Sequence, residues 1–440
     1  MSPATPRISY AGRFHCIGAA CEDDCCTGWT VPVDPQTFER FHRLPPSPLK
    51  DELLVSIEQK TPPTPHFATM RLDAAHHCPM LASSGLCRLQ LAHGESILPE
   101  TCREFPRYRQ RLNGQTETAL ALSCPEAARL VLLAPNLLTD GSYPAAPNMQ
   151  EEARTPLQAW AGQIRALVLW LVSGNRQYPL WQRLFLLRLF CHRLDGLCTR
   201  QSEHQTPALI ARFETSVRTG ALRTTLDRLP ASTEAQLDLV LQLAGLLLHQ
   251  SNVTPRFAAC VQAFTSGIGN GPGATLASLA RGYDEARQQW FEPFLAQHPH
   301  MLENWFVNAI VRHRFPFGWQ SKEELAPASA VEEFDGLAAN FALIRGLLIG
   351  VAGFHRERFS AGHAVHTVQS ASKHFEHHPA FLSRVHMLLR ESGQANARGI
   401  ALLLGEAFPA RPLSPQPFAP QPMAAQHAPS PIPLEAARRQ

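Results

Sequence analysis

Cysteine residues are concentrated near the amino terminus. The 440-residue chain has 11 cysteines, and eight of them lie within the first 124 positions. These eight are Cys16, Cys21, Cys25, Cys26, Cys78, Cys87, Cys102 and Cys124. Thiolates are the usual ligands of structural zinc and of iron–sulfur clusters, which each need up to about four of them. We therefore interpret the eight cysteines as candidate metal ligands.

The spacing of the cysteines does not decide which metal is bound. Eight thiols are enough for one 4Fe-4S cluster with spare cysteines or for two zinc ions, and soft thiolates suit both metals. His15, His76 and His77 lie beside the cysteine blocks and can complete a mixed site. Histidines in polar loops are more often surface residues.

Disulfides and inert buried thiols are the alternatives to a metal. No continuous apolar stretch precedes Cys16, so we expect no secretory signal, a cytoplasmic location and reduced thiols. The adjacent pair Cys25 and Cys26 disfavours a disulfide further, because the ring that it would close is strained. The three remaining cysteines lie in apolar helical patterns and are expected to be ordinary buried thiols.

The chain that must position these thiols falls into three parts. Residues 1–130 are rich in turn residues, with prolines in LPPSPLK and TPPTPHF, and we expect an irregular cysteine-rich metal-binding module. Residues 150–407 repeat apolar side chains with helical spacing, which predicts a multi-helix domain of about eight to ten helices. Residues 408–440 contain frequent prolines and are expected to form a disordered tail. The fold class is therefore predicted to be mainly α.

Four segments of the second part carry the helical pattern most clearly. They are residues 156–172, 179–197, 232–250 and 330–354. Pro156 and Pro179 lie near the first turns of the first two, and Ser232 or Thr233 can cap the third.

Composition argues against some classes of function. The net charge of +3 gives no electrostatic basis for binding nucleic acid or an anionic membrane. The longest apolar segments, such as LDLVLQLAGLLL, are too short or too interrupted to cross a bilayer, which needs roughly 20 apolar residues. We expect a soluble protein without membrane insertion.

Polar residues elsewhere are weaker candidates for cofactor binding. Glu303, Asn304 and Asn308 share one face of a predicted helix, where they can line a pocket or serve helix capping and buried hydrogen bonds. Arg107 belongs to a run of arginines after Cys102. Such a run can pair with a cofactor carboxylate or an acidic protein surface, or form a solvated basic strip.

Two short runs favour simple interpretations. SGIGNGPGAT, at residues 266–275, has the glycines of a nucleotide-binding loop, yet a helical pattern precedes it and we expect a linker between helices. Glu22, Asp23 and Asp24 lie between cysteines and are expected to form a solvated acidic turn.

Several blocks occur in an order that is typical of one protein family. FHCIGAACEDDCCTGWTVPVD opens the series, CPMLASSGLCRLQLAHGESILPETCREFPR and SCPEAARLVL follow, and LENWFVNAIVRHRFPFGW lies in the carboxyl-terminal half. In these blocks the chain resembles the flagellin lysine-N-methylase family, which is related to cysteine-cluster proteins described as zinc- or iron-chelating. The matching positions are scattered over most of the chain.

The resemblance implies an activity, cofactors and a partner. It implies transfer of methyl groups from S-adenosylmethionine to lysine side chains of flagellin, with a 4Fe-4S cluster in the cysteine module and zinc as the alternative. Radical enzymes usually present Cys-x3-Cys-x2-Cys, and Gly28 stands where the third cysteine would follow Cys21 and Cys25. A neutral lysine amine is already a competent nucleophile toward a sulfonium methyl group, so the cluster is expected to be structural or redox-active.

The sequence leaves the catalytic residues and the methyl-donor pocket unidentified, and it leaves two other classes of function open. One is a metal-stapled protein-binding module without catalysis. The other is a protein that handles zinc or iron.

Overall fold

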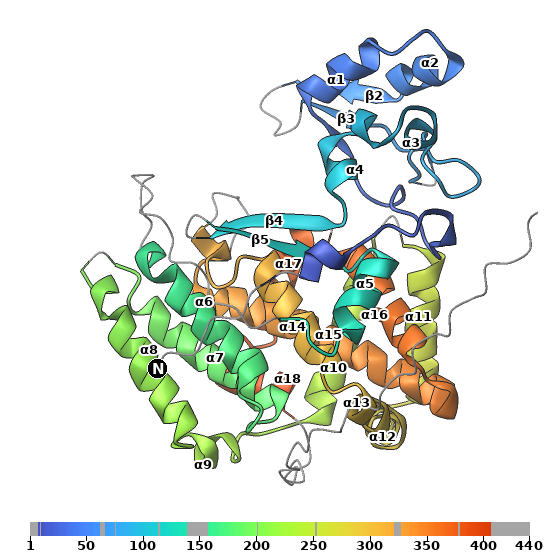
Figure 1. Ribbon diagram of the computed structural model, residues 1–440. Helices are drawn as coiled ribbons and strands as arrows, with labels where there is room; N and C mark the ends of the chain where they lie inside the picture. The colour runs from blue at the N-terminus through green and yellow to red at the C-terminus, as the bar shows by residue number, and fades with distance from the viewer. Residues whose placement is uncertain are drawn as a thin grey trace, which may run out of the picture. The chain divides into compact units, whose positions relative to one another are not determined.

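A computed structural model describes most of the chain up to residue 405. The described residues are 8, 10–61, 67–74, 76–112, 115–138, 157–199, 201–250, 253–320, 327–376 and 379–405. The chain divides into two compact units, Met1–Ala407 and Phe408–Gln440. The predicted Pro-rich tail coincides with the second unit and lies outside the described residues. The first unit is mainly helical, which confirms the predicted fold class at that level (Figure 1).

A small antiparallel sheet lies in the amino-terminal region. Its strands are β1 (Pro32–Val33), β2 (Ile57–Gln59) and β3 (Ala68–Met70), in the order β1-β3-β2. The central strand β3 places Thr69 opposite both Pro32 and Glu58. The strands are short because prolines and turn residues interrupt the chain on either side of them.

Four short helices accompany this sheet. They are α1 (Pro35–His42), α2 (Pro48–Val55), α3 (Arg88–His93) and α4 (Glu100–Glu104). Asp34 and Ser47 cap the first two helices by accepting hydrogen bonds from main-chain N–H groups, and each of these helices begins with a proline. Apolar residues from Val31 to Leu98 form a separate small core here. We call the described residues from Cys16 to Glu104 the cysteine module.

The next segments pack on the main core of the protein. The hairpin strands β4 (Arg107–Leu112) and β5 (Gln115–Leu120) are antiparallel and are followed by α5 (Pro125–Leu133). Their apolar side chains join the same core as the helices that follow, and so do Tyr10 and Phe14. The predicted boundaries at residues 130 and 150 stay predictions, because the division into compact units does not separate these parts.

Thirteen α-helices follow in the described part of the chain, more than the eight to ten expected. They are α6 (Ala161–Leu169), α7 (Leu180–Asp195), α8 (Thr206–Arg218), α9 (Arg223–Leu226), α10 (Thr233–Leu248), α11 (Pro255–Gly267), α12 (Leu276–Ala286), α13 (Glu292–Gln297), α14 (Met301–Arg312), α15 (Ala330–His355), α16 (Ala361–Phe375), α17 (Pro379–Glu391) and α18 (Ala397–Leu404). Part of the difference arises because α9 and α13 are too short to show a full apolar period. We call α6 to α18, together with β4, β5 and α5, the helical body.

The local helix predictions are confirmed. All four segments with the clearest pattern contain α-helices, namely α6, α7, α10 and α15. The start signal expected at Pro156 lies outside the described residues. Ser232 caps α10 by accepting a hydrogen bond from the N–H of Ala235. The glycine run at 266–275 connects α11 to α12, and a helix precedes it rather than a strand, as expected for a linker.

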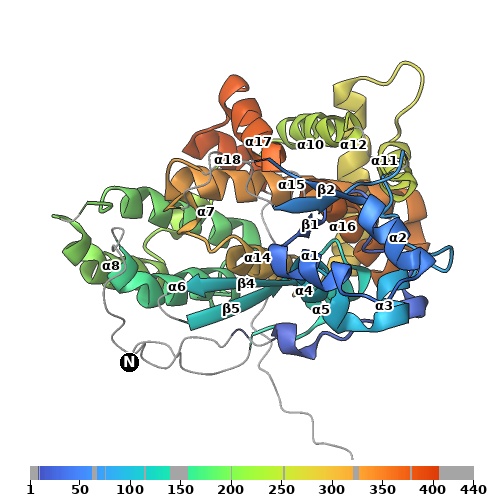
Figure 2. The same ribbon diagram turned by 90° about the horizontal axis from the view of Figure 1, so that it is seen from above.

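Helix α15 is the centre of the helical body. It contacts α7, α10, α11, α16 and α18, and Figure 2 shows it running among them. The helix is long and apolar enough to cross a membrane by length and composition, but 89% of its most apolar window is buried inside the protein. An all-round apolar helix with this burial is a core helix.

Glycines bring α11 unusually close to α15. A Cβ atom on Gly350 would lie 2.6 Å from the main-chain oxygen of Phe264, and one on Gly267 would lie 1.8 Å from the oxygen of Gly350. Side chains at these positions would therefore push the two backbones apart. By contrast, a Cβ atom on Gly245 in α10 would meet nothing within 4 Å.

The first prediction concerns this close packing. The substitution Gly350→Ala should destabilise the protein by about 1–3 kcal/mol, because overpacking forces main-chain shifts. The matched change Gly245→Ala should leave stability unchanged or raise it by up to about 1 kcal/mol, since alanine favours helix. Urea unfolding followed by circular dichroism measures both variants. A Gly350→Ala variant as stable as the wild type would contradict the packing described.

Candidate metal-binding site

The cysteine module brings together five thiols from four separate places in the sequence. They are Cys25, Cys26, Cys78, Cys87 and Cys102. A main-chain hydrogen bond of 2.8 Å from Cys78 N to Cys26 O joins the first two cysteine blocks. Cys87 pairs with Leu81 in an isolated bridge and is the N-cap residue of α3, while Cys102 lies in α4. All cysteines of the chain are free thiols in the structure.

The charges of these thiols influence one another. Burial raises the pKa of Cys78 to about 11, and negative charge on Cys87 and Cys25 adds to the rise. Burial, with Cys25, Cys78 and Cys87, likewise raises the pKa of Cys102. A hydrogen bond with Cys26 lowers the pKa of Cys25 to about 7. Thiols whose pKa values are raised by burial and by each other are the groups that a bound cation would stabilise as thiolates.

A second group consists of Cys16, Cys21 and Cys124. Cys124 is the N-cap residue of α5. Burial raises its pKa to about 12, and charges on Cys21 and Cys25 add to the rise. Hydrogen bonds from main-chain N–H groups at the start of α5 lower the pKa but do not offset burial. Burial also raises the pKa of Cys21, and a charge on Cys16 contributes. Cys25 therefore interacts with both groups.

The donor set fits a thiolate-bound metal by its chemistry, because the module holds more than four free thiols whose charges affect one another. Their side chains do not form a closed coordination shell. Over the described ranges, no three side chains of His, Cys, Asp or Glu are grouped closely enough to hold a metal ion. The metal therefore stays a prediction. Of the flanking histidines, His77 is about half exposed and lies 3.7 Å from Asp73.

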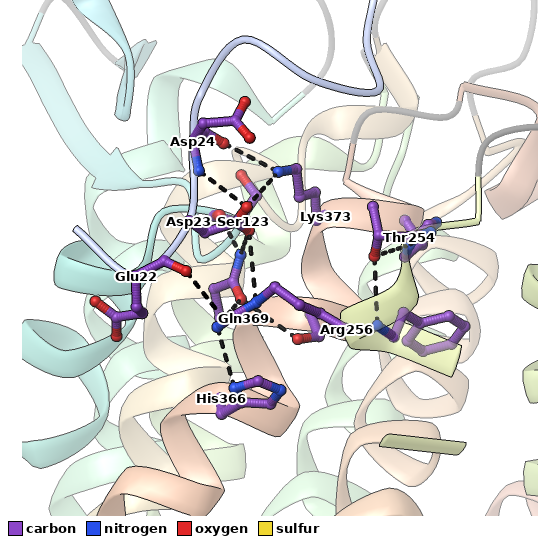
Figure 3. Close-up of polar contacts among 12 residues, drawn as sticks. Glu22, Asp23, Asp24, Ser123, Thr254, Arg256, His366, Gln369 and Lys373 are labelled. Atoms are coloured by element: carbon purple, nitrogen blue, oxygen red, sulfur yellow. Dashed lines mark hydrogen bonds and ion pairs between the residues drawn. The ribbon is translucent and has the colours of Figure 1, made fainter. Parts of the chain in front are cut away.

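The acidic run between the cysteines was expected to form a solvated turn, and this prediction was wrong for Asp23, whereas Glu22 is exposed. The Asp23 side chain is only 10% exposed. Its carboxylate accepts hydrogen bonds from Gln369 Nε2 at 2.7 Å and from Lys373 Nζ at 3.0 Å (Figure 3). Burial favours the neutral acid, but Lys373 and Gln369 outweigh it, so the pKa of Asp23 lies below its ordinary value.

The neighbours of Asp23 are also held by the helical body. Arg129 NH2 of α5 lies 2.6 Å from Glu22 Oε1, and Arg256 NH1 of α11 donates to the carbonyl oxygen of Glu22 at 3.0 Å. Lys373 Nζ donates to the carbonyl oxygen of Asp24 at 2.9 Å. Contacts from three helices thus fix the loop between Cys21 and Cys25.

Most of these contacts come from one face of α16. His366, Gln369, Lys373 and Glu376 follow one another at helical spacing, the last as the C-cap residue, and we call them the α16 stripe. Gln369 Nε2 also donates to the carbonyl oxygen of Ser123 at 2.9 Å. Glu376 accepts from the main-chain N–H groups of Leu122 and Ser123 at 3.2 and 3.3 Å. The stripe therefore contacts the chain beside Cys124 as well as the chain beside Cys21.

Sequence reasoning missed the α16 stripe. The signal that was present is the spacing of four polar residues along one face of a helix whose other positions include Ala364, Val365 and Val368. A polar stripe on a helix normally indicates a solvated face. Here Gln369 is completely buried and Lys373 is 8% exposed.

The residues Glu303, Asn304 and Asn308 are buried and bound to other parts of the protein. Glu303 pairs with Arg183 at 2.8 Å. Asn304 Nδ2 donates to the carbonyl oxygens of Val131 and Ala134 at the end of α5. These contacts correspond to the second interpretation given for the three residues, buried hydrogen bonding, rather than the lining of a pocket.

Asn308 joins α14 to the hairpin. Its Oδ1 accepts from Tyr10 OH at 2.7 Å and from Leu120 N at 3.1 Å, and its Nδ2 donates to Leu120 O at 2.9 Å. Arg107 is also bound locally, because its NH2 group donates to Phe14 O at 3.1 Å and its guanidinium lies over the Phe14 ring. The structure therefore places Asn308 and Arg107 where they connect the helical body to the residues that precede Cys16.

Comparisons with known proteins place this chain in a family. Residues 170–403, more than half of the chain, match the family model described as the FliB lysine N-methylase C-terminal domain. The chain is 29% identical over 135 residues to Lysine-N-methylase of Salmonella typhimurium, covering 30% of this chain and 33% of that protein. It is 28% identical over 134 residues to Flagellar biosynthetic protein FliU of Salmonella muenchen, covering 30% of this chain and 79% of that protein.

A second Lysine-N-methylase, from Salmonella choleraesuis, is 28% identical over 135 residues, again 30% of this chain and 33% of that protein. The alignments thus span about a third of the length of both lysine-N-methylases. No solved structure matches the chain significantly. The family model covers most of the helical body, including the α16 stripe, and the chain therefore belongs to the FliB lysine N-methylase family.

Proposed function

We propose that the protein methylates lysine side chains of flagellin in the cytoplasm, with S-adenosylmethionine as the methyl donor. The observation that supports this most directly is the family match across residues 170–403, since relatives aligned with the chain carry the name lysine-N-methylase. The name of a third relative, a flagellar biosynthetic protein, favours a protein substrate of the flagellar system.

The proposed reaction is a direct transfer to nitrogen. The donor supplies, when bound, a sulfonium methyl group as the electrophile. A C–N bond to the lysine amine forms as the C–S bond breaks, the neutral thioether leaves, and the amine loses one proton. Lysine has an ordinary pKa of about 10.4, so the protein must desolvate the amine or offer a base to present it uncharged. Holding the two reactants in line supplies much of the rate.

We further propose that the cysteine module holds a 4Fe-4S cluster, with zinc as the alternative. The residues that would hold it are drawn from Cys25, Cys26, Cys78, Cys87 and Cys102, whose thiols interact with one another. Such a centre would supply a structural link between loops that have little apolar core of their own. The proposed transfer does not require it as a reactant.

The second prediction concerns the metal. Full-length protein purified without oxygen should be brown and contain about four iron atoms and four sulfides per chain, as a 4Fe-4S cluster requires. Cys25→Ser and Cys78→Ser should each strongly lower the iron and sulfide content. Cys198→Ser, three residues beyond the end of α7, should leave it unchanged. A colourless protein with bound zinc would favour the zinc alternative. A wild type without either metal would contradict the proposed site.

The third prediction concerns the activity. Incubation of the metal-loaded protein with flagellin and isotopically labelled S-adenosylmethionine should place label on lysine, detected by mass spectrometry of flagellin peptides. Flagellin whose lysines have been acetylated is the matched control and should remain unlabelled. Binding of flagellin without label transfer would contradict the enzyme and support a protein-binding module. Transfer of metal to an apo-acceptor without methylation would support a metal-handling protein.

A further inference from the structure

We infer that the α16 stripe positions the loop that carries Cys25, a ligand of the proposed metal site, relative to Cys124 of the second cysteine group. Gln369, Lys373 and Glu376 hold the chain beside Cys21 and Cys25 and the chain beside Cys124 on one face of one helix. These are positioning residues outside the metal's own ligand set. The inference rests on the proposed metal site and goes beyond it, because it assigns a role to residues of the helical body that lie about 350 positions from the first cysteines.

Gln369 carries the first step of the argument. Its single amide nitrogen donates both to Asp23 Oδ2 at 2.7 Å and to Ser123 O at 2.9 Å. Asp23 lies midway between Cys21 and Cys25, and Ser123 directly precedes Cys124. One completely buried amide therefore sets the separation of two cysteine-bearing segments that are about 100 residues apart in the sequence.

Glu376 fixes the second segment independently. Its two carboxylate oxygens accept from the N–H groups of Leu122 and Ser123, at 3.2 and 3.3 Å. Arg312 NH1 of α14 lies 3.3 Å from the same carboxylate. The main chain that leads into Cys124 is therefore held from both its N–H and its carbonyl side.

Lys373 carries the electrostatic step. Its ammonium group contacts the Asp23 carboxylate and the Asp24 carbonyl oxygen, and the side chain is 8% exposed. Burying a lysine is costly unless negative charge compensates it. A centre with four thiolate ligands would be net negative, so a buried ammonium group beside the loop that carries Cys25 would stabilise it and would make its reduction easier.

The distribution of the contacts argues against simple docking of two surfaces. Glu22, Asp23 and Asp24 are three consecutive residues between cysteines, and each receives at least one contact from α5, α11 or α16. Apolar packing alone could attach the cysteine module to the helical body. Directional hydrogen bonds to every residue between Cys21 and Cys25 instead specify the conformation of this loop.

The experiment compares Lys373→Met and Gln369→Leu with a matched control. The control, Arg188→Met, also breaks a buried ion pair, the pair with Asp335 between α7 and α15, but its contacts lie within the helical body. Gln369→Leu leaves the Lys373–Asp23 pair intact, so it tests positioning even if Lys373→Met folds poorly. Circular dichroism and thermal unfolding show how much stability each variant has lost.

The readout is metal retention by the full-length protein, measured as the chelator concentration that removes half of the bound iron or zinc. Lys373→Met and Gln369→Leu should weaken retention roughly 10-fold to 100-fold, as loss of outer contacts does in other metal sites. Arg188→Met should retain metal like the wild type at a comparable loss of stability.

For an iron–sulfur centre, Lys373→Met should also make the reduction potential more negative, and Lys373→Arg should restore most of it, because the positive charge is kept. Wild-type metal retention and an unchanged potential in Lys373→Met, together with wild-type retention in Gln369→Leu, would overturn the inference while leaving the metal site in place. A wild type that binds neither metal would overturn both.

Discussion

The architecture depends on the burial of α15. A helix of 26 residues that is apolar on all sides has to be covered on all sides, and other helices of the body do this, among them α7, α10, α11, α12 and α16. The glycines at the contact with α11 let the two backbones meet, so α11 is held at a fixed position. Helix α16 packs against the same core helix and turns its polar stripe toward the cysteine loop. The loop is thus attached to an element whose own position is set by the hydrophobic core.

The sequence was sufficient where the signal is local. The apolar period of α7, α10 and α15 predicts a helix without knowledge of the partners, and the hydroxyl residues Ser232 and Thr233 predict the start of α10. Short helices such as α9 could not be predicted in this way, because fewer than two turns cannot display a period. The glycine run was interpreted correctly because its context, a helix rather than a strand, is also local.

The sequence was insufficient where the partner is remote. A run of three acidic residues normally lies in water, and nothing near Asp23 in the chain shows that Lys373 and Gln369 will bury it. For the same reason the α16 stripe was missed, because polar residues at helical spacing look like a solvated face. The number and positions of the cysteines indicated the candidate ligands, but which thiols interact depends on how the loop, α3 and α4 fold together.

The contacts of Asp23 also bear on how such a protein can change over evolutionary time. The loop around the first cysteines and the helix that holds it are separated by about 350 residues in the sequence, yet one carboxylate, one amide and one ammonium group join them. A recombination event that exchanged only the amino-terminal part for that of a distant relative would separate these groups. The two regions are therefore expected to be inherited together, although they contain separate apolar cores.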